Sequence, residues 1–144
     1  MNEEIDLLKY LLTNIKIQQD MLYKILKKKE IKDEVYELIR HNILEYKKFN
    51  VSIRRMLKTR EKKYNKETNI ALGIASSIGA NVKVEDKLEY LKLMREYNEV
   101  NLLDIERVKK EYKIKSKTII KLIDRIEQFE KNSLDRIDLF INMK

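Results

Sequence analysis

The chain has no cysteine, no proline and no tryptophan, and it has two glycines and one histidine among 144 residues. Without cysteine there can be no disulfide, thiolate zinc site or thiol nucleophile. One histidine cannot supply a two-histidine site within one chain. Carboxylate pairs could support acid–base chemistry, but no pair stands out by its spacing. We therefore expect no enzyme, no metal site and no cofactor.

Long apolar runs are also missing. No window approaches eighteen apolar residues, so we expect no helix that spans a membrane. The chain begins "MNEEIDLLKY", which is acidic where a secretory signal would be basic. The expected location is cytoplasmic.

The sequence is rich in Lys, Glu, Leu and Ile, and no proline and only two glycines interrupt it. This composition predicts an all-α protein. Apolar residues with a three–four spacing predict long helices from about residue 3 to 29, 34 to 63, 84 to 113 and 116 to 142. Gln19 and Asn50 are polar breaks in the first two stripes. Asp33 and Ser116 are candidate N-caps.

The segment "NIALGIASSIGANV" (69–82) lies in the longest stretch without charged residues. It lacks the lysine and the strand context of a phosphate-binding loop, and it is too short to span a bilayer. Small residues four apart let a neighbouring backbone approach closely. We therefore predict a short helix over 69–80, closely packed through Gly73, Ala75, Ser76, Ser77, Gly79 and Ala80. Shallow insertion into a bilayer surface is the alternative.

These elements predict a single domain over residues 1–144. A hairpin over 3–63 and a hairpin over 84–142 would be joined by the short helix to form a four-helix bundle of antiparallel helices. The alternative is an extended α-hairpin assembly that completes its core by dimerising.

The order of elements is similar to that of small bacterial ferritin-like bundles of unassigned function, of the stress-induced and spore-coat type. The resemblance rests on "IDLLKYLLTNIKIQQDMLYKIL", "IKDEVYELIRHNILEYKKFNVSIRRML" and "DKLEYLKLMREYNEVNLLDIERVKKEY". It implies a di-iron site only if Glu-x-x-His pairs are present. Here Glu37 lies four residues before His41, and no Glu-x-x-His occurs, so the ligands are largely missing. His41 itself is expected to be a surface or half-buried helical residue beside a carboxylate.

The formal net charge of +8 is concentrated in "KKFNVSIRRMLKTREKKYNK" (47–66), which holds nine basic residues and one acid. At about 100° per residue, most of these cations share one arc of the helix, and only Val51 violates the division from the apolar side. A one-sided cationic stripe can bind an acidic protein, nucleic acid or anionic lipid, and it can also be a merely solvated face. The candidate binding residues are Lys47, Lys48, Arg54, Arg55, Lys58, Lys62 and Lys66.

The leading hypothesis is a non-enzymatic interaction protein that self-associates, as a dimer or another homo-oligomer, and meets an acidic partner through this stripe. The alternatives are a nucleic-acid-binding protein that uses the same stripe and a ferritin-like metal or redox protein.

Overall fold

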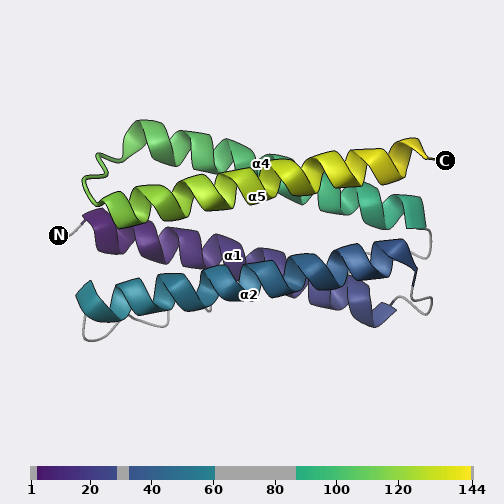
Figure 1. The fold of residues 1–144 in the computed structure, drawn as a ribbon, viewed down its shortest axis with the longest axis horizontal. Helices are drawn as coiled ribbons and strands as arrows, with labels where there is room; N and C mark the ends of the chain where they lie inside the picture. Colours follow the sequence, from purple (N-terminus) through teal and green to yellow (C-terminus); the bar gives the residue numbers. More distant parts are fainter. Residues whose placement is uncertain (1–2, 29–32, 61–86, 144) are drawn as a thin grey trace. The chain divides into compact units, whose positions relative to one another are not determined.

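In the computed structural model the described residues are 3–28, 33–60 and 87–143. They form four α-helices and no strand: α1 (Glu3–Lys28), α2 (Glu34–Arg60), α4 (Lys87–Glu111) and α5 (Lys117–Asn142) (Figure 1). The all-α prediction is confirmed for these parts of the chain. The predicted helix over 69–80 and its small residues lie outside the described residues.

Both predicted N-caps are confirmed. The Asp33 carboxylate accepts a hydrogen bond from the backbone N–H of Tyr36 at 2.9 Å, and the Ser116 hydroxyl accepts one from Ile119 at 3.3 Å. Each bond satisfies a backbone donor that has no partner within its helix. Acidic residues lie in the first turn of α1 and lysines in its last turn, and both interact favourably with the helix dipole.

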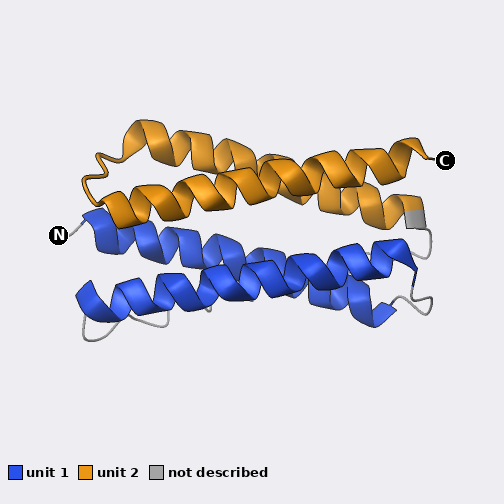
Figure 2. Ribbon diagram, viewed as in Figure 1, with its two compact units in different colours: residues 1–85 blue, residues 86–144 orange. Residues whose placement is uncertain are grey.

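The chain divides into two compact units, residues 1–85 and 86–144, and each is described by itself (Figure 2). In the first unit α1 and α2 pack against each other. They are antiparallel, because Arg60 near the end of α2 pairs with Glu4 near the start of α1, with 3.3 Å between Nε and Oε1. Halfway along, the amide of Asn50 donates to Gln19 at 3.4 Å, so the two predicted polar breaks meet.

The core of the first unit follows the predicted stripes closely. Burial of each such side chain contributes about 1.5–3 kcal/mol to folding. The residues buried in this unit include Leu7, Leu8, Leu11, Leu12, Ile15, Leu22, Ile25, Val35, Leu38, Ile39, Ile43, Tyr46, Phe49, Ile53 and Leu57.

In the second unit α4 and α5 pack against each other and are also antiparallel. Arg95 in the first half of α4 pairs with Asp138 near the end of α5, and Lys109 near the end of α4 pairs with Glu127. The apolar core lies toward the two ends of this pair, with Leu91 and Met94 on one side of the middle and Ile105 and Val108 on the other. Polar residues occupy the middle of the pair.

None of the helices in the described ranges is long and apolar enough to cross a membrane.

Replacing Asp33 by Ala should lower the free energy of unfolding by about 1 kcal/mol, because the first turn of α2 loses its side-chain acceptor. The matched control is Asp33→Asn, which keeps an oxygen at the same place and should stay close to wild type. Urea unfolding followed by circular dichroism measures both. Equal stability of the Ala and Asn variants would contradict this account of the cap.

Candidate functional site

The predicted cationic stripe lies mostly on the surface of α2. Lys47, Lys48, Arg55 and Lys58 are exposed, whereas Arg54 is half-buried. The last two members of the stripe, Lys62 and Lys66, lie outside the described residues. Of the five members of the stripe that the structure describes, four are exposed and one is half-buried.

Arg54 is half-buried and bonds to a side chain of its own helix. Its Nε donates to the side-chain oxygen of Asn50 at 2.6 Å, and Asn50 in turn donates to Gln19 of α1. Burial lowers the pKa of Lys16, also on α1, and the charge of Arg54 lowers it further. Arg54 therefore belongs to a polar bridge between the two helices, and it is a poor choice for testing surface binding.

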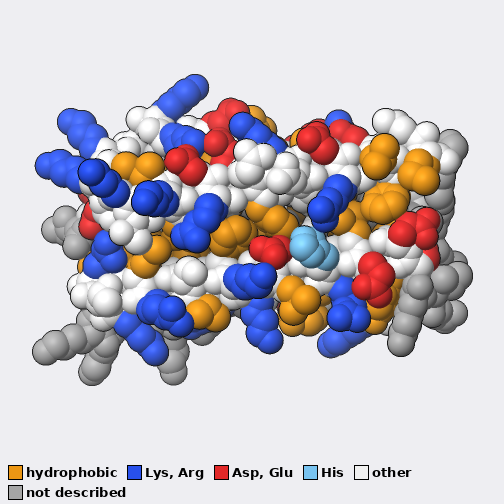
Figure 3. Space-filling model, viewed as in Figure 1, with side chains coloured by type: hydrophobic (Ala, Val, Ile, Leu, Met, Phe, Trp, Pro, Cys, Tyr) orange, Lys and Arg blue, Asp and Glu red, His pale blue; other side chains and the backbone are white. Residues whose placement is uncertain are grey.

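The exposed stripe also contains apolar side chains. Leu44 is 50% exposed and Val51 is 49% exposed, and they are seven residues apart, as are Val51 and Lys58. Seven residues are nearly two helical turns, so these positions follow one line along the helix. Figure 3 shows hydrophobic side chains between basic ones in this part of the surface. We call this surface the α2 outer face, and it consists of Arg40, Leu44, Lys47, Lys48, Val51, Arg55 and Lys58.

The α2 outer face carries little compensating negative charge. Lys48 pairs with Glu45 at 3.2 Å. Within the described ranges no acid lies at ion-pair distance from Arg40, Lys47, Arg55 or Lys58. From residue 47 to residue 58 the sequence has five basic residues and no acid. The part of the cationic stripe from residue 47 to residue 58 is therefore about 16 Å long at 1.5 Å per residue.

His41 is exposed on α2, as expected from the sequence. Among the residues that the structure describes, no three His, Asp or Glu side chains come together in a group that could hold a metal ion. The geometry thus offers no ligand set to support a ferritin-like centre, and that resemblance stays a prediction.

Sequence reasoning missed a buried polar cluster between α4 and α5. Glu130 is 0% exposed, and its carboxylate accepts hydrogen bonds from the side-chain amides of Asn98 and Asn101, the latter at 2.7 Å. The Ser133 hydroxyl donates to the amide oxygen of Asn98 at 3.4 Å. All four side chains are buried.

The heptad spacing contains the signal for this cluster. Residues 91, 94, 98, 101, 105 and 108 alternate three and four apart, and residues 119, 123, 126, 130, 133 and 137 do the same. Asn98, Asn101, Glu130 and Ser133 are the polar residues on these two lines. Tyr97 and Leu102 are more hydrophobic than the neighbouring Asn98 and Asn101, but both are only half-buried.

The chemistry of the buried polar cluster is structural. The two amide donors offset the cost of removing a carboxylate from water, and each oxygen of Glu130 has a donor. The carboxylate is inaccessible, so a substrate cannot reach it. A cluster of this kind fixes the register of a helix pair, because sliding α4 along α5 would separate donors from acceptor.

Ion pairs on the surface of the second unit flank this cluster. A hydrogen bond to Asp138, followed by the charges of Asp138 and Glu99, raises the pKa of Arg95. A hydrogen bond to Glu127 is the main cause that raises the pKa of Lys109, whose Nζ lies 2.7 Å from Glu127 and 3.1 Å from Asp124.

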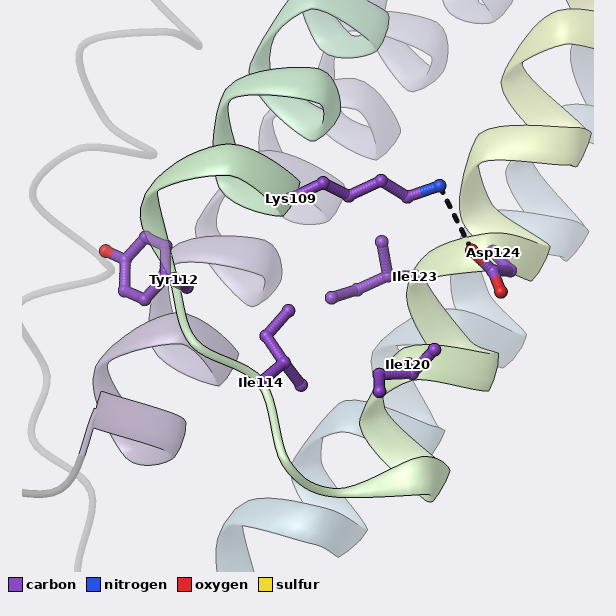
Figure 4. Close-up of a pocket in the computed structure, with 6 residues that line it drawn as sticks. All are labelled: Lys109, Tyr112, Ile114, Ile120, Ile123 and Asp124. Atoms are coloured by element: carbon purple, nitrogen blue, oxygen red, sulfur yellow. Dashed lines mark ion pairs between the residues drawn. The ribbon is translucent and has the colours of Figure 1, made fainter.

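A small pocket lies beside Lys109, where α4 leads into α5. Its volume is about 230 Å³, below the roughly 300–1,000 Å³ usual for small-molecule sites. Figure 4 shows Ile114, Ile120 and Ile123 around it, with Tyr112 to one side and Lys109 reaching across to Asp124. The ammonium group of this lysine already pairs with Asp124 and Glu127.

The surface of α4 opposite its buried side carries both acidic and apolar side chains, and Lys92, Arg107 and Lys110 are also exposed there. Val100 is 59% exposed and Leu103 is 65% exposed. Glu96 is exposed one turn before Val100, and Glu89 is exposed two turns before Glu96. Burial raises the pKa of Tyr97, and the charge of Glu96 raises it further. We call this surface the α4 outer face, and it consists of Glu89, Leu93, Glu96, Val100, Leu103, Arg107 and Glu111.

The chain matches no protein-family model, no curated protein and no solved structure among those compared. What the chain does therefore has to be inferred from its own side chains. The features available are the α2 outer face, the α4 outer face, the buried polar cluster and the small pocket.

Replacing Glu130 by Ala should lower the free energy of unfolding by about 3 kcal/mol, because two amide donors stay buried without their acceptor. Apolar replacement of the whole cluster, Asn98→Leu/Asn101→Leu/Glu130→Leu/Ser133→Ala, should recover most of that loss. Chemical denaturation measures both, with Glu106→Ala on the exposed side of α4 as the glutamate control. A loss no larger for Glu130→Ala than for Glu106→Ala would show that the cluster is unimportant for stability.

Proposed function

We propose that this chain is a non-enzymatic helical interaction protein whose α2 outer face binds an acidic protein partner. The supporting observation is the run of cations from Lys47 to Lys58, three of which are exposed and make no ion pair with the described acids. Such a surface raises the local concentration of anionic groups and speeds their association at low ionic strength. Salt screens this attraction over about 8–10 Å.

Leu44 and Val51 favour a protein partner over nucleic acid. Leu44 lies between Arg40 and Lys47, just before the cationic stripe, and Val51 lies between Lys48 and Arg55 within it. A phosphate backbone gains nothing from two exposed aliphatic side chains. An amphipathic acidic helix gains both apolar burial along the line of Leu44 and Val51 and charge pairing on either side of it. Nucleic-acid binding by the same face is the competing outcome.

The proposal also includes the fold of the whole chain. We propose that the two helical pairs and the segment 69–80 form one four-helix bundle over residues 1–144. The width of the apolar stripe on α1 supports this: adjacent residues are buried at Leu7 and Leu8 and again at Leu11 and Leu12. A two-helix seam needs only one such residue per three to four positions, so the wider stripe suits packing against more than one neighbour.

If the bundle is one cooperative domain, tryptophan probes in the two units should report the same urea midpoint. The chain has no tryptophan of its own, so Tyr23→Trp on α1 and Tyr112→Trp after α4 each give a single probe. Both replace side chains that are not fully buried. Far-ultraviolet circular dichroism of each variant serves as the control for native helix content. Separate fluorescence midpoints would mean two independent units.

The acidic-partner proposal is tested with a synthetic amphipathic helix that carries leucines at its heptad core positions and glutamates beside them. Lys47→Glu/Arg55→Glu/Lys58→Glu should weaken its binding at least ~10-fold, because attraction becomes repulsion at three positions. Arg54 is left unchanged because it contacts Asn50. Isothermal titration calorimetry at low and high ionic strength gives the affinities.

The matched control is Lys121→Glu/Arg125→Glu/Lys131→Glu, which changes the net charge equally on exposed positions of α5. This variant should bind the peptide much as wild type does. A peptide with glutamine in place of glutamate should bind weakly to all three proteins. If the wild-type protein does not bind the acidic peptide but binds polynucleotide through the α2 outer face, nucleic-acid binding replaces this proposal.

A further inference from the structure

We infer that the acidic partner of the α2 outer face is the α4 outer face of a second copy of this chain. The inference rests on the proposed function, because it names the partner that the same face would bind. It comes from a match in charge, apolar content and spacing between two surfaces that were described separately above.

The α2 outer face has a regular order. Its central line runs through Arg40, Leu44, Lys47 and Val51, with steps of four, three and four residues. This is the spacing of the contact positions of a coiled coil. Arg40 and Lys47 are exposed cations, and Leu44 and Val51 are half-exposed aliphatic residues. Positive and apolar positions therefore alternate.

The α4 outer face has the same order with the opposite charge. Its central line runs through Glu89, Leu93, Glu96 and Val100, again with steps of four, three and four. Glu89 and Glu96 are exposed, and within the described ranges neither has an ion-pair partner. Leu93 is half-buried and Val100 is exposed.

A parallel pairing of the two lines brings unlike charges together and buries apolar side chains against each other. In parallel coiled coils, equivalent heptad positions of the two helices form a layer. The charge complementarity ends where Lys58 would face Arg107, because both side chains are basic. The contact therefore extends over about four turns. The successive layers are Arg40 with Glu89, Leu44 with Leu93, Lys47 with Glu96, and Val51 with Val100.

The same arrangement disfavours pairing between like faces. Two α2 outer faces would bring Lys47 next to Lys47, and two α4 outer faces would bring Glu96 next to Glu96. A reciprocal exchange of the mixed contact gives a closed dimer, whereas a one-way exchange gives longer assemblies. Exposed ion pairs contribute little individually, so we expect modest affinity that falls with salt.

Disulfide trapping tests the contact directly, because the chain has no cysteine of its own. Facing core positions of a parallel pair bring Cα atoms within disulfide range. When full-length Val51→Cys and Val100→Cys proteins are mixed under mild oxidation, the mixed disulfide should exceed each like-with-like disulfide. The control pair is Val51→Cys with Leu139→Cys, an exposed position on α5, which should form little mixed product. A predominance of Val51→Cys paired with itself would overturn the inference.

A charge exchange provides a second, independent measurement. By sedimentation equilibrium at low ionic strength, Lys47→Glu and Glu96→Lys should each weaken self-association about 10-fold or more. The double variant Lys47→Glu/Glu96→Lys should restore it, because the pair is re-formed with reversed signs. Wild type that stays monomeric at high concentration, or a double variant no better than the single ones, would overturn the inference.

The acidic peptide separates this inference from the proposed function. A monomeric chain that still binds the peptide through the α2 outer face would refute the second copy as partner and leave the proposed function standing. A chain that neither associates nor binds the peptide would refute both.

Discussion

Burial of apolar side chains at three- and four-residue intervals holds each helical pair together. No disulfide can do so, because the chain has no cysteine, and most of the ion pairs lie at the surface, where they contribute about 0–1 kcal/mol each. Both glycines lie outside the four described helices, so no glycine weakens their interiors. Stability thus depends on rows of Leu and Ile, which are mutually interchangeable and specify register poorly.

The polar residues inside the two pairs supply that missing specificity. In the first unit Gln19 and Asn50 meet across the helices, and Arg54 bonds to the same asparagine. In the second, Glu130 is enclosed by two amides and fully removed from solvent. Sliding by one heptad would keep the apolar contacts but leave these donors and acceptors without partners. Each pair therefore has polar contacts between its helices that favour a single alignment.

Much of the local structure could be predicted from the sequence because it depends on short-range rules. The starts of α2 and α5 follow from the capping chemistry of Asp33 and Ser116, and helical angle accounts for the exposure of most cations of α2. The buried polar cluster was missed because Asn98 and Glu130 resemble surface residues when hydrophobicity alone is considered. The half-buried state of Arg54 could not be predicted, because it depends on Asn50 and on the neighbouring helix, and helical angle does not contain that information.

The outer faces of α2 and α4 follow the same spacing as the inner ones, but charge gives them a different role. An inner line such as Ile39, Ile43 and Tyr46 is apolar throughout and packs strongly with little selectivity. An outer line that alternates charged and aliphatic residues gains less from burial, and it repels every surface of like sign. That combination suits reversible recognition, because the aliphatic residues can be buried only against a surface of opposite charge. In the proposed pairing, the positive charge on α2 would therefore supply selectivity between helices in addition to solubility.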